Sequence, residues 1–410
     1  MAEPKLRFKD EQGREYPEWK RQKLGNIFVQ TNNYSTLDDK KELYSLTVEN
    51  GITPKTERYD RSFLVKKNDK FKIVHKNEFV YNPMNMTIGA VGYNNLRKDI
   101  IVSGYYVVMK SNNVSTNEYW YNWLKSPKTI RLFKQKATGS LIEKQRIQFS
   151  TFEKIKADIP SLPEQQKIAD FLTTVDRQID IQSQRVEAMK TRKKGLLQKI
   201  FSQEIRFKNE QGQVYPEWIV QKLEELVSMH ARIGWQNLRT SEFLNSGDYY
   251  LVTGTDFVNG KIDFSTCHYI GKERFEQDKK IQLDNDNILI TKDGTLGKVA
   301  YVDILPKPTT LNAGIFCLKS KKQNINMKYL FQYLRGPFMM QYCNRHSTGG
   351  TIKHLNQGVL ITFPVPLPSL SEQQKIADFL TAVDHQIEVE ENRLERMQVI
   401  KKGLLQQMFI

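Results

Sequence analysis

Apolar residues recur at alternating steps of four and three over two long stretches of the chain, the first beginning at Pro160 and the second at Pro368. This spacing places the apolar side chains on one helix face and is typical of a coiled-coil seam. Most aligned positions of the two stretches are identical, without a gap. The predicted seam consists of Ile168, Leu172, Val175, Ile179, Val186 and Met189, then Ile376, Leu380, Val383, Ile387, Leu394 and Met397.

Each stretch is predicted to be one long helix. Ser161 with Glu164, and Ser369 with Glu372, have the spacing of a capping box, in which two side chains satisfy free amides at a helix start. Roughly 38 residues at about 1.5 Å each make a helix of about 57 Å. Because neither apolar face can be buried alone, we expect the two helices to pack against each other.

Polar residues interrupt the seam at matching places in the two stretches. Gln182 corresponds to Glu390, and Lys193 corresponds to Lys401. Buried polar residues in a seam fix register and partner at some cost in stability. The alternative is that these side chains face solvent near the helix ends, and the sequence leaves both interpretations open.

The duplication extends beyond the helices. Residues 205–218, which follow the first helix, resemble residues 6–19 at the N-terminus, whereas the second helix has no such sequel. The pattern therefore predicts two similar halves in a circular arrangement with pseudo-twofold symmetry. We expect its two ends to lie close together.

The segments between the repeats, roughly 25–159 and 224–366, hardly match in sequence but share an order of features. Aromatic helices precede Pro127 and Pro337, and small polar loops begin at Thr138 and Thr348. Short apolar runs bounded by turn residues predict buried strands at Glu78–Tyr81, Asn287–Ile290, Ser103–Met109 and Gly314–Lys319.

These features predict an α/β or α+β fold with two similar domains. Residues 1–159 and 205–367 form the domains, and residues 160–204 and 368–410 form the helices between them. A chain of 410 residues is too long for one ordinary core. A scaffold that is kept while the surface diverges suggests one docking task performed on two different targets.

The composition indicates a cytoplasmic protein that binds a polyanion. We expect neither a membrane span nor a signal peptide, because no long apolar run is present and the N-terminus is charged. Three cysteines fit a reducing compartment. A net charge of +16 favours nucleic acid as the partner, without choosing between DNA and RNA.

Signals for catalysis are weak. Gly294–Lys298 lacks the spacing of a nucleotide-binding loop. Asn82 and Pro83 are not followed by the second proline and aromatic residue of an adenine methyltransferase motif. Cys343 and His346 have a ligand-like spacing, but no second pair follows. We therefore expect a non-catalytic chain without a metal site.

Polar loops after the predicted strands are the best candidates for DNA contact. In the second domain the candidates are Lys292, Asp293, Thr295 and Lys298, in a basic, glycine-rich loop suited to phosphates and base edges. In the first domain they are Asn82, Asn85 and Thr87, and the side-chain amides of the two asparagines can pair with adenine. An ordinary β-turn with incidental polarity is the alternative.

The small polar loops that follow the aromatic helices supply a further group of candidates. Their composition suits phosphate clamping, although basic residues at a helix C-terminus also complement the helix dipole. These candidates are Thr138, Ser140 and Lys144 in the first domain and Thr348, Lys353 and His354 in the second. The basic cluster Lys190–Lys194 is interpreted as a docking surface or a solvated helix face in preference to a DNA contact.

The repeated Glu-Gln-Gln helices, their Lys-Lys-Gly-Leu-Leu-Gln ends at 193–198 and 401–406, and the Thr-Gly loops resemble the specificity subunit of a type I restriction–modification system. This resemblance implies two target recognition domains, each reading half of a split, asymmetric DNA site. It also implies an antiparallel coiled coil that sets the gap between the half-sites. Runs 286–289 and, further from the pattern, 77–80 depart from the family.

The resemblance further implies that this chain has no catalysis of its own. It would bind two methyltransferase subunits and, in the full complex, two ATP-dependent translocase–nuclease subunits. S-adenosylmethionine, ATP and Mg²⁺ would then belong to those partners. The rival hypotheses are a stand-alone two-headed DNA-binding regulator or architectural protein, and an enzyme that acts on nucleic acid by itself.

Overall fold

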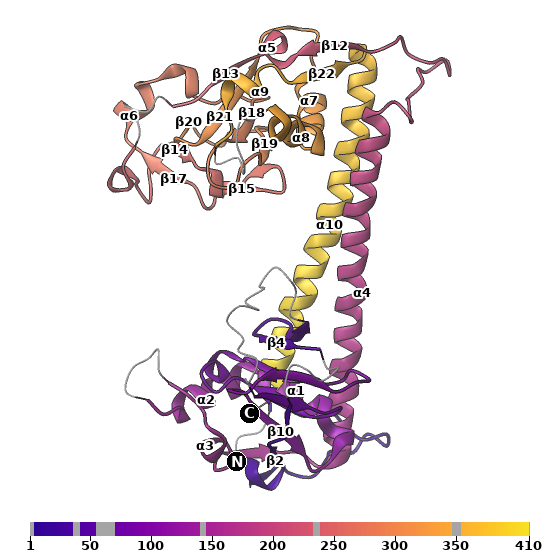
Figure 1. Cartoon of the computed structure of the whole chain (residues 1–410), viewed down its shortest axis with the longest axis vertical. Coiled ribbons are helices and arrows are strands. Elements are labelled where there is room, and N and C mark those ends of the chain that lie inside the picture. The colour runs from indigo at the N-terminus through magenta and orange to yellow at the C-terminus, as the bar shows by residue number, and fades with distance from the viewer. Residues whose placement is uncertain are drawn as a thin grey trace. The chain divides into compact units, whose positions relative to one another are not determined.

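The computed structural model describes residues 4–35, 42–54, 70–139, 145–232, 238–346 and 354–409. The chain divides into two compact units (Figure 1). Unit 1 comprises residues 1–184 and 391–410, and unit 2 comprises residues 185–390. This division follows contacts in space, whereas the predicted four-part division follows the chain, so the predicted boundaries stay a prediction.

Two long helices carry the repeated stretches. Helix α4 spans Leu162–Phe201 and helix α10 spans Leu370–Met408, which confirms the predicted single helices. In unit 1 the start of α4 shares a hydrophobic core with the end of α10, through Leu172 and Leu405. In unit 2 the end of α4 shares a core with the start of α10, through Leu197 and Leu380. Because beginnings pack with ends, the helices are antiparallel.

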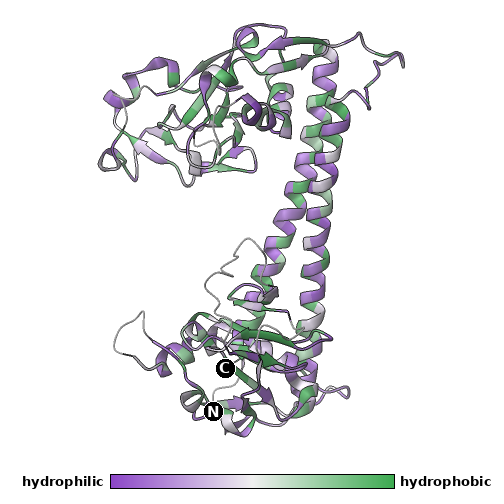
Figure 2. Cartoon of the chain, in the orientation of Figure 1, coloured by the Kyte–Doolittle hydropathy of each residue, from purple (hydrophilic) through white to green (hydrophobic). Residues whose placement is uncertain are grey.

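The predicted seam is buried. Along both long helices hydrophobic and hydrophilic residues alternate (Figure 2). The residues with under a tenth of their surface exposed are Ile168, Leu172, Val186, Ile376, Leu380 and Ile387, and the others are half-buried. Gln182 and Lys193 are also buried. Of the two interpretations left open, burial of the polar seam positions is therefore correct for α4.

Each unit is built around a four-stranded antiparallel sheet. The strands of unit 1 are β2 (Phe28–Thr31), β10 (Val107–Ser111), β7 (Phe79–Tyr81) and β8 (Val91–Tyr93), in that spatial order. Those of unit 2 are β13 (Val227–His230), β21 (Ile315–Ser320), β18 (Ile288–Thr291) and β19 (Val299–Tyr301), in the same order. The two divergent segments therefore share one fold, as predicted.

Each central sheet is accompanied by three helices and by a two-stranded antiparallel sheet whose strands are distant in sequence. Unit 1 contains α1 (Asn117–Lys125), α2 (Pro127–Lys136), α3 (Phe149–Phe152) and the pair β1 (Lys20–Lys23) with β11 (Lys156–Ile159). Unit 2 contains α7 (Met327–Leu334), α8 (Pro337–His346), α9 (Gln357–Leu360) and the pair β12 (Ile219–Lys222) with β22 (Pro364–Leu367). The aromatic helices predicted before Pro127 and Pro337 are α1 and α7.

The units differ at their periphery. Unit 1 has the antiparallel sheet β3 (Tyr34–Ser35), β6 (Phe71–Val74) and β9 (Ile100–Ser103), and the hairpin β4 (Tyr44–Thr47) with β5 (Gly51–Pro54). Unit 2 has β17 (His268–Ile270), β14 (Tyr249–Val252) and β20 (Thr309–Leu311), with β14 and β20 parallel, and the hairpin β15 (Phe257–Val258) with β16 (Lys261–Ile262). The mixture of helices with mainly antiparallel sheets is the α+β form of the predicted class.

Short helical turns complete the described structure. They are α5 (Leu223–Leu226), α6 (Lys272–Glu276) and the 3₁₀ turns η1 (Leu24–Asn26), η4 (Met86–Ile88), η5 (Val114–Thr116), η8 (Thr240–Glu242), η9 (Gly254–Asp256) and η10 (Lys279–Ile281). The predicted strand Ser103–Met109 is in fact the end of β9, a turn and the start of β10. Its apolar run continued across the turn, so the sequence pattern merged two strands.

The two chain ends meet inside unit 1 (Figure 1). The amide of Leu6 donates a hydrogen bond of 3.1 Å to the carbonyl of Gln407. At the equivalent place in unit 2, the amide of Ile205 donates 3.0 Å to the carbonyl of Lys199, across a covalent turn. The expected closeness of the ends is confirmed, and a non-covalent contact in unit 1 repeats what a continuous chain does in unit 2.

Candidate nucleic-acid interface

The candidate loop of unit 2 connects β18 to β19 and is held by its own hydrogen bonds. The hydroxyl of Thr291 donates to the carbonyl of Thr295 and accepts from the amide of Lys298 at 2.9 Å. Gly294 and Gly297 both have φ of +71°, a left-handed conformation that glycine adopts without steric cost. The exposed side chains of Asp293, Thr295 and Lys298 therefore project from a defined backbone.

A second predicted segment joins this loop. The Nδ1 atom of His354 lies 2.5 Å from the Oδ1 atom of Asp293, and the amide of Leu355 donates 2.8 Å to the carbonyl of Lys292. The ammonium group of Lys292 lies 5.5 Å from the ring centre of Phe316. Five predicted residues thus form one polar surface in unit 2, namely Lys292, Asp293, Thr295, Lys298 and His354.

The equivalent loop of unit 1 connects β7 to β8. The amide of Ile147 donates 2.9 Å to the carbonyl of Pro83, the same connection that Leu355 makes to Lys292 in unit 2. Thr138 lies beside this connection because it pairs with Arg146 through two backbone hydrogen bonds, of 3.0 and 2.9 Å. Both units therefore bring the same two predicted segments together.

The side chains of the unit 1 loop differ in their freedom to bind. The Oδ1 atom of Asn82 accepts from the amide of Met84 at 3.0 Å and so stabilises its own turn. Asn85 is exposed and Thr87 is half-buried. The predicted residues Ser140, Lys144, Thr348 and Lys353 lie outside the described residues. Asn85 is thus better placed than Asn82 for a bidentate contact with a base.

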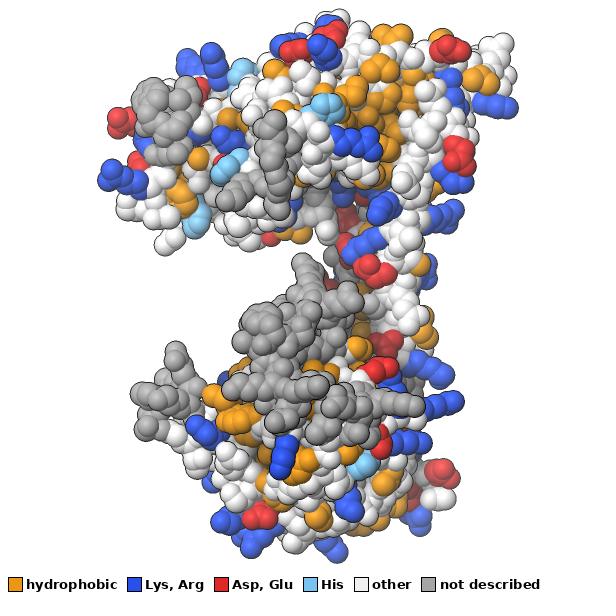
Figure 3. All heavy atoms as spheres, in the orientation of Figure 1, with side chains coloured by type: hydrophobic (Ala, Val, Ile, Leu, Met, Phe, Trp, Pro, Cys, Tyr) orange, Lys and Arg blue, Asp and Glu red, His pale blue; other side chains and the backbone are white. Residues whose placement is uncertain are grey.

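Positive charge occurs on both units. Lysine and arginine side chains are distributed over the visible face of each (Figure 3). Together with the net charge of +16, this gives the chain the electrostatic attraction to phosphates that sequence-independent DNA binding requires. The two loops differ in charge, because Lys292, Asp293 and Lys298 lie in the loop of unit 2, whereas residues 82–89 of unit 1 contain no charged side chain.

Buried clamps that the sequence prediction missed fix the starts of the long helices. Arg7 donates to both carboxylate oxygens of Glu164, at 3.0 and 2.9 Å, and the indole of Trp19 donates at 3.2 Å. In unit 2, Arg206 and Trp218 make the same contacts with Glu372, at 3.2, 2.8 and 2.9 Å. These contacts connect each helix start to the segment that precedes its domain.

The glutamate half of each predicted capping box is wrong. Glu164 and Glu372 are fully buried, and their carboxylates bind arginine and tryptophan instead of the amide at the helix start. The hydroxyl of Ser369 still accepts from the amide of Glu372, at 3.4 Å. The recurrence of arginine and tryptophan in segments 6–19 and 205–218 was the available signal for the true partners.

Reciprocal ion pairs connect the long helices within each unit. Lys193 binds Asp384 at 2.5 Å in unit 2, and Lys401 binds Asp176 in unit 1. Asp384 also accepts from Arg335 at 2.9 Å and Gln332 at 2.8 Å. Burial, together with the nearby Arg335, lowers the pKa of Lys193 to about 8, although Asp384 opposes this shift. Lys193 therefore belongs to the helix pairing and is not free for DNA.

The described residues were also considered for metal sites, reactive cysteines and membrane-spanning helices. Within those residues, no cluster of three or more histidine, cysteine, aspartate or glutamate side chains is arranged to hold a metal ion. Burial raises the pKa of the Cys343 thiol to about 11 and that of Cys317 to about 12, which disfavours the reactive thiolate. No helix among the described residues is both long and apolar enough to cross a membrane.

Comparison with known proteins shows that one family model matches both copies of the duplication. The type I restriction modification DNA specificity domain matches twice, at residues 16–191 and 216–398. The chain belongs to this family. Each matched range includes one clamp tryptophan, one candidate loop and most of one long helix, so a specificity domain repeat covers each half of the sequence.

Individual relatives carry the same description. The chain is 26% identical over 321 residues to the type I restriction enzyme MjaVIII specificity subunit of Methanocaldococcus jannaschii, covering 75% of this chain and 73% of that protein. It is 23% identical over 145 residues to the EcoR124I/EcoR124II specificity subunit of Escherichia coli, covering 35% of each.

Solved structures share the fold. A type I restriction–modification S subunit from M. genitalium aligns with a TM-score of 0.55 at 16% identity, covering 100% of this chain and 99% of that one. A chain from a study of complex assembly and conformational transition of a type I system aligns with a TM-score of 0.56 at 13% identity, covering 96% and 98%. The specificity-domain fold thus extends over the whole sequence.

Proposed function

We propose that this chain is the sequence-reading, non-catalytic specificity subunit of a type I restriction–modification complex. The observation that carries the proposal is one framework built twice, with a differently charged polar loop presented at the same place in each unit. A duplicated framework with unlike reading surfaces fits a DNA site made of two dissimilar halves. The match of both halves of the chain to the specificity domain supports this function.

The loop chemistry gives each unit a role. In unit 2, Lys292 and Lys298 suit phosphate oxygens or the acceptor edge of guanine, and Asp293 suits the amino group of cytosine. In unit 1, Asn85 suits the paired donor and acceptor of adenine, with Thr87 and Thr138 beside it. Each unit would read its half-site from the major groove, where the four base pairs are distinguishable.

Partner subunits would dock on the long helices. Besides Leu162 at the very start of α4, the large aliphatic side chains of α4 and α10 that are at least half exposed among the described residues are Ile181, Val389, Val399 and Ile400, at 53, 51, 63 and 60%. Apolar side chains left in solvent on a helix suit a protein partner. We propose two methyltransferase subunits there and, in the full complex, two restriction–translocase subunits. S-adenosylmethionine, ATP and Mg²⁺ would bind to these partners, in the cytoplasm.

A stand-alone DNA-binding regulator or architectural protein is not favoured. The relatives named above are specificity subunits, and the match to the first of them covers most of both chains. The two functions are separable by binding. A regulator binds its site tightly as an isolated chain, whereas the proposed subunit binds weakly alone and strongly with its methyltransferase partner.

Mapping methylated adenines across a genome tests the proposal. Cells that contain this chain and its methyltransferase subunit should methylate one split, asymmetric sequence. Exchanging residues 25–159 for the corresponding segment of another specificity subunit should change one half of that sequence and leave the other unchanged. Methylation that does not depend on this chain, or a change in both halves, would contradict the proposal.

A further inference from the structure

Helix α2 of unit 1 presents positive charge without a partner. Its ten residues contain Lys128, Arg131, Lys134 and Lys136 and no acidic residue. Lys128 is half-buried, and the other three are exposed. Among the residues that the structure describes, none of these four side chains takes part in a hydrogen bond or an ion pair. Such a concentration of unpaired cations attracts an anion.

Helix stability does not account for this charge. Lys134 and Lys136 lie in the last turn, where cations complement the helix dipole. Lys128, however, is the second residue of the helix, where the dipole favours negative charge, and the first turn has no acidic residue. Lys128 and Arg131 are also neighbours on the helix surface, so their like charges repel each other. A bound polyanion would remove both costs.

Helix α2 lies directly against the candidate loop that connects β7 to β8. A Cβ atom added to Gly89, at the end of the loop, would lie 3.0 Å from Cδ1 of Ile130, in the middle of α2. Met86 of the loop and Phe133 of the helix are fully buried in the same core. Lys134 follows Ile130 by one turn and lies on the same face of the helix. The cations of α2 are therefore next to the side chains proposed to contact bases.

Helix α8 occupies the equivalent place in unit 2 without this charge. Gly297 of the candidate loop lies against Met340, as Gly89 lies against Ile130. Aligning the two helices at their first prolines gives both the same order of buried, half-buried and exposed positions. In this alignment the four cationic positions of α2 correspond to Phe338, Gln341, Asn344 and His346. The two helices therefore differ in charge and not in their burial.

The candidate loops have the opposite distribution of charge. The loop of unit 2 contains Lys292 and Lys298, whereas residues 82–89 of unit 1 contain no charged side chain. Each unit therefore has basic side chains beside the position proposed for base contact. They lie on the helix in unit 1 and on the loop in unit 2.

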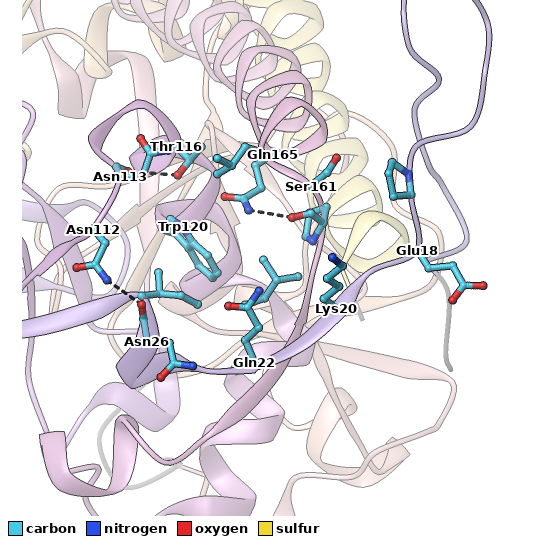
Figure 4. A pocket seen from close by; sticks show the side chains of 15 residues that line it. Glu18, Lys20, Gln22, Asn26, Asn112, Asn113, Thr116, Trp120, Ser161 and Gln165 are labelled. Atoms are coloured by element: carbon cyan, nitrogen blue, oxygen red, sulfur yellow. Dashed lines mark hydrogen bonds between the residues drawn. The ribbon is translucent and has the colours of Figure 1, made fainter.

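A cavity of unit 1 offers no comparable site for a polyanion. It lies beside the start of α4 and has a volume of about 360 Å³ (Figure 4). Its lining contains one cation, Lys20, and one anion, Glu18, and its other lining residues are uncharged. Helix α2, and not this cavity, therefore has the excess of positive charge that suits a polyanion.

We propose that α2 binds the phosphate backbone of duplex DNA beside the half-site of unit 1, through Lys128, Arg131 and Lys134. These three residues span about 9 Å of helix, and each DNA strand has one phosphate per about 3.4 Å of duplex. In unit 2, Lys292 and Lys298 of the loop make this contact instead. Because phosphates carry no sequence information, α2 contributes affinity and position and leaves base preference to the loop. This inference rests on the proposed function, since it takes unit 1 to be a DNA-reading domain.

The salt dependence of DNA binding tests this assignment. A triple variant with Lys128→Gln, Arg131→Gln and Lys134→Gln is assembled with the methyltransferase subunit and bound to a duplex that contains the recognised site. Each phosphate contact contributes about −0.9 to the slope of log K against log salt concentration, so the slope should become shallower by up to about 2.7. Base preference in both half-sites should stay as in the wild type, because the lost contacts are to phosphates.

Two further variants give a matched control and a gain of binding. Replacing Lys20, Lys23 and Lys156, three exposed lysines on β1 and β11 of the same unit, by glutamine removes the same charge from a different sheet. This control should shift the slope by less than one contact, or about 0.9. Transferring two cations to α8, as Gln341→Arg with Asn344→Lys, should make the slope steeper by up to about 1.8. Misfolding cannot produce such a gain.

Four outcomes would overturn the proposal. They are equal slope shifts in the α2 variant and its control, an altered base preference in the half-site of unit 1, loss of the methyltransferase subunit from the α2 variant, and an unchanged slope in the α8 variant. The third outcome would make α2 a protein-binding surface. Failure of the proposed function is distinct, because the wild-type complex itself would then show no preference for a split site.

Discussion

Unit 1 and unit 2 are the same framework with different surfaces, and the comparison separates two kinds of residue. Three kinds of contact recur in both units. They are the arginine–tryptophan clamps, the lysine–aspartate pairs, and the backbone hydrogen bond that Ile147 in unit 1 and Leu355 in unit 2 donate to the candidate loop. Each of these contacts joins segments that are distant in sequence, so changing one partner disrupts the other. The candidate loops at residues 82–89 and 291–298, by contrast, are stabilised mainly by hydrogen bonds within themselves. Their outward side chains can therefore change without disturbing the framework.

The largest expected effect is loss of a clamp. Arg7→Met in unit 1, or Arg206→Met in unit 2, leaves a fully buried glutamate without its cation, and should lower the free energy of unfolding by about 3 kcal/mol. Urea unfolding measures this loss. Lys9→Met is the matched control, because Lys9 and Glu15 are both more than half exposed, and it should cost less than about 0.5 kcal/mol. Clearly unequal losses in the two units would show that their frameworks are not equivalent.

Next in size is the change in DNA reading. Asn85→Ala should weaken binding by about 1–3 kcal/mol and relax base preference only in the half-site of unit 1. Lys298→Ala should act only on the half-site of unit 2. The measurement is binding of the assembled complex to duplexes in which one half-site at a time is altered. If either variant affected both halves equally, the assignment of one half-site to each unit would be wrong.

A smaller effect distinguishes two equivalent tyrosines. The hydroxyl of Tyr329 donates 2.5 Å to the carbonyl of Pro366, whereas the buried hydroxyl of Tyr119 has no hydrogen-bond partner among the described residues. Tyr329→Phe should therefore cost about 1 kcal/mol, and Tyr119→Phe should be neutral or slightly stabilising. Thermal unfolding of the two variants compares them directly. A larger loss at Tyr119 would reverse this prediction.

The pH dependence of stability should report on the lysine–aspartate pair of unit 2. Lys193 has its pKa lowered to about 8 in the folded protein, so between about pH 8 and its unfolded value of 10.5 the unfolded state binds more protons. The contribution of Lys193 to the free energy of unfolding therefore rises with pH across this window. Subtracting the melting curve of Lys193→Met from that of the wild type isolates this contribution. A difference that falls with rising pH would contradict the assigned direction.

The fold was largely predictable, because duplication and the spacing of apolar residues are properties of the sequence itself. The long helices, Phe79–Tyr81 and Ile288–Thr291 as buried strands, and the meeting of the chain ends all follow from those patterns. The capping boxes failed because Glu164 and Glu372 had distant partners that local spacing does not reveal. Likewise, Gln165 and Gln373 differ in environment despite nearly identical flanking sequence: the Oε1 atom of Gln373 accepts from the amide of Asn326, whereas that of Gln165 has no hydrogen-bond partner among the described residues.

The candidate site was only partly predictable. Proximity of the Asp293 loop to His354 depends on residues 354 and 355 lying beside that loop, which no local pattern encodes. The use of Asn82 in its own turn likewise depends on the path of the backbone. Composition therefore identified which loops are polar, whereas the structure determines which of their side chains remain available to a base.

The contact between Leu6 and Gln407 has a consequence for how such a chain can arise. Unit 1 takes residues 391–410 from the far end of the sequence, and residues 185–202 have the equivalent place in unit 2. A gene of half this length, encoding one head and one helix, would already supply every element of a unit if two copies of its product exchanged helix ends. Tandem fusion of that gene would then free each half to acquire its own target.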